Sequence, residues 1–203
     1  MSTARIDKVV VPGVFSLDGQ DFDVENNVWL VGDDEEVLVI DAPHDAAPIV
    51  AAIGGRSVAG IVLTHGHNDH ITAAVALREA TGAPVWFHPE DRMLWDVVHP
   101  DTTPDQDLAD GTRFTVAGTT LIALHTPGHS PGSTCLHAPE LGTVFTGDTL
   151  FCGGPGATGR SYSDHPTIVR SIRERLFALP GDTVVRTGHG DDTTIDAERT
   201  NVP

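Results

Sequence analysis

Short apolar runs alternate with polar turns along the first half of the chain, and this pattern predicts several strands and one helix. Residues 28–31 and 37–40 are two such runs separated by five residues, four of them acidic, which predicts a β-hairpin. Residues 6–15 alternate loosely around a Pro-Gly pair, which predicts an edge strand with a bend. Residues 46–53 predict a short helix because a Gly-Gly pair ends the pattern, and residues 58–63 predict the next strand.

The second half repeats this order, with hairpins, then a helix, then a strand. The predicted strands cover residues 84–87, 113–116, 119–124, 133–137, 143–146 and 183–186, and the predicted helices cover residues 71–81 and 166–178. Residues 91–110 are polar and contain two prolines, which predicts a surface excursion or a lid, and the residues from Asp191 onward predict a polar tail. We therefore expect one α/β domain, residues 1–203, built from two sheets between helices.

The composition narrows the class of protein. At 203 residues, 39% of them hydrophobic, the chain is long enough for one domain with a sizeable core. The formal net charge of -17 argues against nucleic acid or an anionic membrane as a partner. No apolar run has the length of a membrane span, and residues 1–23 lack the apolar core of a signal peptide. The two cysteines are too few for a disulfide framework, so we expect a reducing cytoplasm.

A cluster of metal-binding side chains follows the predicted strand 58–63 and precedes the predicted helix. His65, His67 and His70 supply three imidazoles and Asp69 supplies a carboxylate within six residues. Imidazole nitrogens and carboxylate oxygens are ligands of Zn²⁺ and of other first-row transition metals. Gly66 is expected to give the backbone the freedom that lets the neighbouring imidazoles converge. The sequence therefore predicts a metal site on the turn between a strand and a helix.

Three later segments place further ligands beside glycines at predicted strand ends. His129 lies on a loop between two Pro/Gly pairs, Asp148 follows Gly147, and His189 lies between two glycines after the last predicted strand. Asp41 closes an early strand, which is an unusual place for a carboxylate unless it faces a polar site; a hydrogen-bonded turn is its alternative role. The ends of several strands can collect such residues at one edge of a sheet.

The motif His65-x-His67-x-Asp69-His70, followed by His129, Asp148 and His189, resembles that of the metallo-β-lactamase fold superfamily over nearly the whole chain. The resemblance implies an αβ/βα four-layer sandwich with a two-metal site at one edge. One metal would be bound by His65, His67 and His129, the other by Asp69, His70 and His189, with Asp148 bridging both. Asp41 matches an aspartate of the family, and we expect it to accept a hydrogen bond from a ligand imidazole and to fix its tautomer.

Within this superfamily the chain looks most like the short form of the glyoxalase II-like thioester hydrolases (hydroxyacylglutathione hydrolase-like). The runs 126–132 and 147–151 carry that resemblance. Glyoxalase II enzymes have a Lys-x-Tyr that grips the thiol cofactor, and Arg160-Ser161-Tyr162 has the same cation-x-Tyr spacing after about three extra residues. Arg160 and Tyr162 are therefore the predicted substrate-binding residues, with packing of the loop as their alternative role. The thiol can be glutathione or another small thiol.

The predicted reaction is hydrolysis of a small-molecule thioester by a hydroxide that two metal ions activate. Asp148 would hold the ions together and Asp69 would orient the nucleophile, and the ions are expected to be zinc, with iron or manganese as alternatives. Residues 69–72 also resemble the persulfide dioxygenases of the superfamily, which use a single iron, so that activity is one alternative. A non-catalytic metal-binding protein is the other. The oligomeric state stays open.

The other histidines lack a comparable motif and are expected to have packing or surface roles: His44, His88, His99, His125, His137 and His165.

Overall fold

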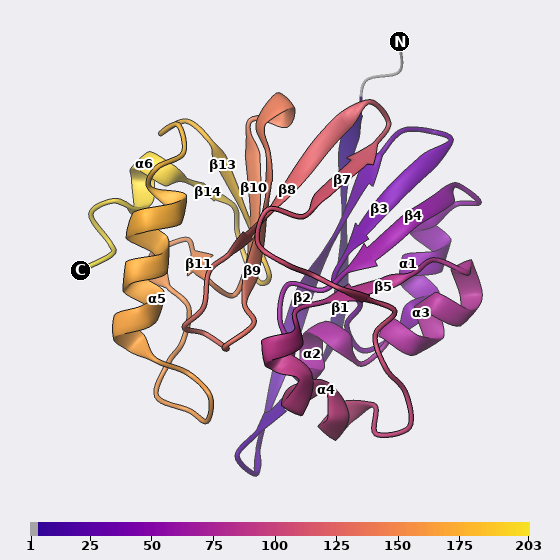
Figure 1. Cartoon of the computed structure of the whole chain (residues 1–203), viewed down its shortest axis with the longest axis horizontal. Helices are drawn as coiled ribbons and strands as arrows, with labels where there is room; N and C mark the ends of the chain where they lie inside the picture. Colours follow the sequence, from indigo (N-terminus) through magenta and orange to yellow (C-terminus); the bar gives the residue numbers. More distant parts are fainter. Residues whose placement is uncertain (1–3) are drawn as a thin grey trace.

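The computed structural model describes residues 4–203, which form two six-stranded sheets packed face to face (Figure 1). The first sheet contains, in spatial order, β1 (Arg5–Leu17), β2 (Gln20–Gly32), β3 (Glu36–Ile40), β4 (Ser57–Val62), β5 (Val85–Phe87) and β6 (Gln106–Asp107). The second contains β14 (Thr193–Thr194), β13 (Val184–Thr187), β10 (Thr143–Gly147), β9 (Thr134–Ala138), β8 (Thr119–His125) and β7 (Arg113–Val116). A small separate hairpin consists of β11 (Leu150–Phe151) and β12 (Gly154–Pro155).

Helices cover the outer face of each sheet. The first sheet carries α1 (Ala46–Ile53), α2 (Asn68–Ile71), α3 (Ala74–Thr81) and α4 (Arg92–Val98), and the second carries α5 (His165–Ser171), its π-helical continuation Ile172–Leu176, and α6 (Ile195–Glu198) (Figure 1). The layers therefore run helix, sheet, sheet, helix, and the predicted αβ/βα sandwich is confirmed. Within residues 4–203, no helix combines the length and the apolar character needed to span a membrane.

The four layers enclose three apolar cores because the central strands bury both faces. Along β3, Val37 and Val39 pack toward the helices of the first sheet, whereas Leu38 and Ile40 pack between the sheets. This follows from the period of two in a strand, which sends successive side chains to opposite faces. The third core lies between the second sheet and α5, and includes Cys135, Val144, Leu150, Ile168, Ile172, Leu176 and Val185. The strand ends that carry the polar site are thus anchored in buried structure.

The structure extends the predicted N-terminal strands into a long hairpin. β1 and β2 pair along their whole length, from Arg5 opposite Gly32 to Leu17 opposite Gln20. The predicted strands did not include residues 20–25, in which Phe22 and Val24 alternate with exposed polar residues. Main-chain hydrogen bonds pair this segment with β1, and the Phe22 ring stacks on the Phe15 ring of β1 with 6.2 Å between the ring centres.

Three other expectations differ from the structure in detail. The predicted helix 71–81 is split, because α2 begins inside the ligand cluster at Asn68 and α3 begins only at Ala74. Residues 91–110 lie mostly at the surface as predicted, but they are not irregular: α4 and β6 lie within them, and Asp91, Leu94, Trp95 and Leu108 are buried. The expected tail also contains β14 and α6.

Candidate metal centre

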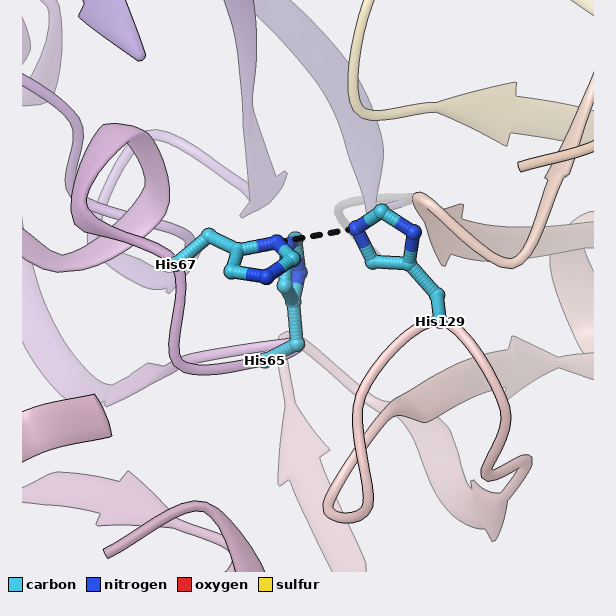
Figure 2. A group of neighbouring side chains, drawn as sticks. All are labelled: His65, His67 and His129. Carbon is cyan, nitrogen blue, oxygen red and sulfur yellow. Dashed lines mark hydrogen bonds between the residues drawn. The ribbon is translucent and has the colours of Figure 1, made fainter. Parts of the chain in front are cut away.

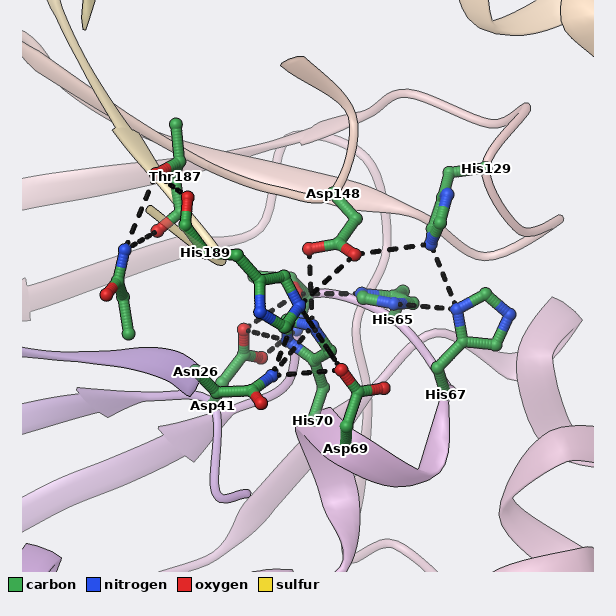
Figure 3. A network of polar contacts seen from close by, with 12 residues as sticks. Asn26, Asp41, His65, His67, Asp69, His70, His129, Asp148, Thr187 and His189 are labelled. Carbon is green, nitrogen blue, oxygen red and sulfur yellow. Dashed lines mark hydrogen bonds and ion pairs between the residues drawn. The ribbon is translucent and has the colours of Figure 1, made fainter. Parts of the chain in front are cut away.

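All seven predicted ligands lie together at one edge of the sandwich, where strand ends from both sheets meet (Figure 3). His65 and His67 follow β4, and Asp69 and His70 lie on α2. The other three come from the second sheet: His129 from the loop between β8 and β9, Asp148 from the end of β10, and His189 from the loop after β13. β3 and β4 are parallel, as are β10 and β13, so their carboxyl ends point to the same edge.

Three imidazoles form the first ligand group, which we call triad one (Figure 2). His67 Nδ1 lies 3.0 Å from His65 Nε2 and 2.9 Å from His129 Nε2. All three side chains are buried. Three ring nitrogens that converge at this spacing match a tetrahedral metal ion with metal–nitrogen distances of about 2.0–2.1 Å.

Asp69, His70 and His189 form the second ligand group, triad two. His189 Nε2 lies 3.2 Å from both His70 Nε2 and Asp69 Oδ2. The Asp148 carboxylate lies between the two triads, with Oδ1 3.2 Å from His70 Nε2 and Oδ2 3.6 Å from His129 Nε2 (Figure 3). Asp148 therefore has the position that a bridging ligand needs.

Asp41 connects the two triads through the ring nitrogens that face away from the other ligands. Its Oδ2 accepts a hydrogen bond from His70 Nδ1 at 2.8 Å and from the Thr64 hydroxyl at 2.9 Å, and its Oδ1 accepts from Thr64 N at 2.7 Å. The Thr64 hydroxyl then accepts from His65 Nδ1 at 3.1 Å. Asp41 has a φ of 66°, a conformation that non-glycine residues seldom adopt, and this turns its carboxylate inward. The contact expected of Asp41 with a ligand imidazole is present.

The outer nitrogens of His129 and His189 also have acceptors, whereas His67 Nε2 is buried without a hydrogen-bond partner among residues 4–203. His129 Nδ1 donates to Ala157 O at 2.9 Å, and His189 Nδ1 donates to Glu25 O at 2.8 Å. Together with Asp41 and Thr64, these acceptors fix the tautomer so that the Nε2 lone pairs of His65, His70, His129 and His189 face inward. Such outer hydrogen bonds are typical of imidazoles that bind metals.

The donor set fits divalent cations. His67 Nδ1 carries at most one hydrogen, yet it faces two imidazole lone pairs about 3 Å away, an arrangement that is repulsive unless a cation lies between them. Asp69 Oδ1 and Asp148 Oδ1 are buried without a hydrogen-bond partner among residues 4–203. Buried carboxylate oxygens of this kind require compensation, which a metal ion would supply.

Burial and charge act differently on the two triads. Burial lowers the pKa of His67 to about 3 and that of His65 well below its ordinary value, and the neighbouring imidazoles act in the same direction. Burial also opposes the charge of His70 and His189, but Asp148 and the other carboxylates outweigh it. They raise the pKa of His70 well above its ordinary value and that of His189 to about 10. Despite its burial, Asp148 has a pKa well below the usual range because His70 and His189 are adjacent.

Two asparagines beside triad two were missed in the sequence. Asn26 is fully buried, and its Nδ2 donates to Asp69 Oδ2 at 3.1 Å, while its Oδ1 contacts His44 Nε2 at 2.8 Å. His44, expected to have an ordinary role, thus supports this asparagine. Asn27 donates from Nδ2 to Thr187 O and Gly190 O at 3.1 and 3.0 Å, which holds the loop that carries His189. The available signal was the pair of amides directly before the apolar run 28–31.

A cleft of about 860 Å³ opens over both triads. One wall is the β1–β2 hairpin, and the other is formed by the metal centre and the segment after β12. The lining residues are Pro12, Gly13, Val14, Phe15, Asp23, Val24, Glu25, Asp69, His129, Asp148, Ala157, His189 and Gly190. The wall is largely apolar beside Phe15, whose ring meets the His67 ring edge-on at 5.2 Å.

Arg160 and Tyr162 lie at the outer side of this hairpin wall. The Arg160 guanidinium lies 4.6 Å from the Phe22 ring centre, and its Nη1 donates to Gln20 Oε1 at 3.3 Å. Tyr162 is 53% exposed, with a φ of 70°. Neither residue lines the cleft itself, although Ala157, three residues before Arg160, does.

The chain belongs to the metallo-β-lactamase superfamily: the family model named "Metallo-beta-lactamase superfamily" matches residues 22–189. That range contains every ligand of both triads.

Its relatives include proteins named as hydrolases. The chain is 32% identical to the hydroxyacylglutathione hydrolase GloC of Haemophilus influenzae, and the match covers 88% of this chain and 92% of that protein. Among solved structures, it is similar to TTHA1623 in a di-iron-bound form, with a TM-score of 0.79, 32% identity and coverage of 96% and 99%. It is also similar to ETHE1 from Myxococcus xanthus, with a TM-score of 0.73, 26% identity and coverage of 96% and 83%. These findings support a metal-dependent hydrolase.

Proposed function

We propose that this protein is a dinuclear metal-dependent hydrolase that cleaves a thioester of a low-molecular-weight thiol. The observation that carries this proposal is the position of Asp148 between two complete ligand triads at the floor of an open, largely apolar cleft. Two divalent cations bound there would lower the pKa of a shared water to about 7 and polarise the acyl carbonyl. The similarity to a hydroxyacylglutathione hydrolase supports the choice of a thioester.

The residues of the chain supply binding, orientation and charge. Asp148 keeps both cations at one reaction site. Asp69 has a free buried oxygen, Oδ1, that can accept a hydrogen bond from the attacking water and orient it. A thiolate with an ordinary pKa of about 8.5 leaves without a strong general acid, so the site needs no further proton donor. Val14, Phe15 and Val24 line the cleft and can exclude water from the acyl group.

For the thiol part of the substrate we propose Arg160 and Tyr162. Both follow Ala157 of the cleft wall, and the Arg160 guanidinium retains N–H groups that can hold a carboxylate. The cations are proposed to be zinc, and the di-iron form of TTHA1623 makes iron the first alternative. We also propose a cytoplasmic location, which the unpaired Cys135 and Cys152 support.

A second candidate is the mononuclear-iron persulfide dioxygenase activity suggested by residues 69–72, and the similarity to ETHE1 is consistent with it. One experiment separates the two. Elemental analysis of protein purified without chelators is expected to give about two first-row metal ions per chain, and a panel of thioesters is expected to include a substrate. A single iron together with oxygen uptake on a persulfide would replace the proposed function by the second candidate. Metal binding without either activity would indicate a non-catalytic protein.

A further inference from the structure

Asp91 is a fully buried carboxylate outside the ligand set, and it accepts three hydrogen bonds. It ends a short 3₁₀ turn, Pro89–Asp91, directly before α4. Its Oδ2 accepts from Gly66 N at 2.8 Å and from Ser130 Oγ at 2.6 Å, and its Oδ1 accepts from Gly132 N at 2.6 Å. One buried carboxylate therefore joins two loops of the chain.

These two loops carry the whole of triad one. Gly66 lies between His65 and His67, and Ser130 follows His129 directly. The first loop continues from β4 of the first sheet, and the second connects β8 and β9 of the second sheet. A metal ion bound by triad one would thus be held across the two sheets, and Asp91 sets the spacing of the loops from the side of α4.

The glycines on these loops provide the space that Asp91 occupies. A Cβ atom on Gly66 would lie 3.1 Å from Asp91 Cβ and 2.8 Å from Leu94 Cβ, and one on Gly132 would lie 2.7 Å from Asp91 Cγ. Neither glycine has a positive φ. The role that the sequence suggested for Gly66, freedom of the backbone, is therefore replaced by close approach to the carboxylate and to α4.

We propose that Asp91 is a positioning residue for triad one, and that it sets the affinity of the metal ion bound there without contacting it. This inference rests on the proposed metal centre but not on the thioester reaction. Asn27 has the corresponding position at triad two, since it holds the His189 loop through Thr187 O and Gly190 O. The two residues provide matched variants that act on opposite triads.

The test uses two backgrounds that each keep one triad. His189→Ala leaves triad one intact, and His129→Ala leaves triad two intact. Zinc dissociation constants are measured on metal-stripped protein by competition with a chromophoric chelator. Asp91→Asn keeps the size of the side chain but presents an NH₂ group to N–H and O–H donors. In the His189→Ala background it is expected to weaken zinc binding by about tenfold, the lower end of the loss for a group bonded to a ligand itself, because Asp91 holds the loops and not the rings.

In the His129→Ala background the same Asp91→Asn substitution is expected to change zinc binding by less than about twofold, whereas Asn27→Ala should show the reverse pattern. Ser130→Ala removes one of the three hydrogen bonds and should weaken triad one less, which keeps the test usable if Asp91→Asn fails to fold. Equal losses in both backgrounds, or none in either, would overturn the proposal. Absence of zinc binding by the unmodified protein would overturn the proposed function itself, and that result is distinct from both of these patterns.

Discussion

The two triads are built from similar side chains in different settings. Triad one takes its imidazoles from two loops that belong to different sheets, and Asp91 links those loops. Triad two takes Asp69 and His70 from a single helical turn, Asp41 and Asn26 contact these two ligands directly, and Asn27 holds the loop of His189. A cation in either triad would therefore bind across the sandwich, because His189 of triad two also comes from the second sheet. The triads differ in that two ligands of triad two share one helical turn, whereas two separate loops supply triad one.

The triads also differ in charge. The low pKa values of His65 and His67 leave these imidazoles neutral at pH 7, whereas the raised pKa values of His70 and His189 leave them protonated before a cation arrives. The reason is position: Asp148, Asp69 and Asp41 all lie close to His70. His70 and His189 of triad two must therefore release protons to bind a metal, whereas His65 and His67 of triad one need not.

The largest expected effect comes from Asp148, the carboxylate that contacts both triads. Asp148→Asn keeps the size of the side chain but removes the negative charge that two cations would share. Thioester hydrolysis is expected to fall by more than about 100-fold, beyond the loss typical of an outer support. The fold should persist because Phe145 and Val185 on the adjacent strands are fully buried in apolar cores.

Steady-state kinetics and far-ultraviolet circular dichroism of Asp148→Asn check both parts of this prediction. Near-normal turnover by a folded variant would show that Asp148 does not bridge, and the two triads would then have to act independently.

The next largest effect is expected for a change of Asp41, which should act differently on the two triads. Asp41 bonds His70 of triad two directly, but it is joined to His65 of triad one only through Thr64. Asp41→Asn should weaken zinc binding by triad two about 10- to 100-fold and should affect triad one less. The two single-triad backgrounds, His129→Ala and His189→Ala, allow each affinity to be measured. Thr64→Val is the matched control, because it removes the hydroxyl that joins Asp41 to His65 but keeps the hydrogen bond between Asp41 and His70. A larger loss of zinc affinity at triad one than at triad two would show that Asp41 supports mainly triad one, contrary to this prediction.

Much of this arrangement could be predicted from the sequence, because ligands at strand ends and apolar runs are local signals. The cluster 65–70 and the motifs around His129, Asp148 and His189 lie within a few residues of the strands that position them. Asp91 could not be predicted to be buried, since its three donors come from residues 25 to 41 positions away. The role of Asn26 was missed for the same reason: Asp69, to which it donates, is 43 positions away, and the pair of amides before the run 28–31 does not name that partner.

The break between α2 and α3 could not be predicted from the sequence either. The apolar pattern of residues 71–81 continues through it, but the backbone must turn so that Ala42 N and Ala73 N can bond to His70 O and Ala42 O, respectively. Tertiary hydrogen bonds of this kind override a helical pattern that the sequence alone favours.

The pH dependence of metal binding should sharpen the comparison. Because the pKa values of His70 and His189 are raised, both imidazoles are protonated between pH 6 and 8, and a cation must displace those protons. Zinc affinity in the His129→Ala background should therefore rise with pH, by about tenfold per unit for each proton released. His65 and His67 have lowered pKa values, so the affinity in the His189→Ala background should change much less over the same range. Equal slopes would contradict the assigned difference in charge.

The smallest effect is expected for Arg160→Ala, which should leave the zinc affinity of both triads unchanged. The Arg160 guanidinium packs on the Phe22 and Phe15 rings of the hairpin and is not among the groups that contact a ligand atom, so Arg160→Ala should not alter either zinc affinity. The contact proposed for it, with a carboxylate on the thiol part of the substrate, is made equally in the ground state and the transition state. Its loss should therefore raise KM by about tenfold and leave kcat nearly unchanged.

A pair of thioesters that differ only in one carboxylate tests this directly. Arg160→Ala should weaken use of the carboxylate-bearing thioester and spare the neutral one, and Arg160→Lys should recover part of the loss because it restores charge without the planar fork. Arg170→Ala, a change of an exposed arginine on α5, is the matched control. Equal losses on both thioesters would assign Arg160 to holding the hairpin through Phe22 and Gln20. Because that hairpin forms a wall of the cleft over both triads, such a result would make the wall, and not a charge, the determinant of substrate binding.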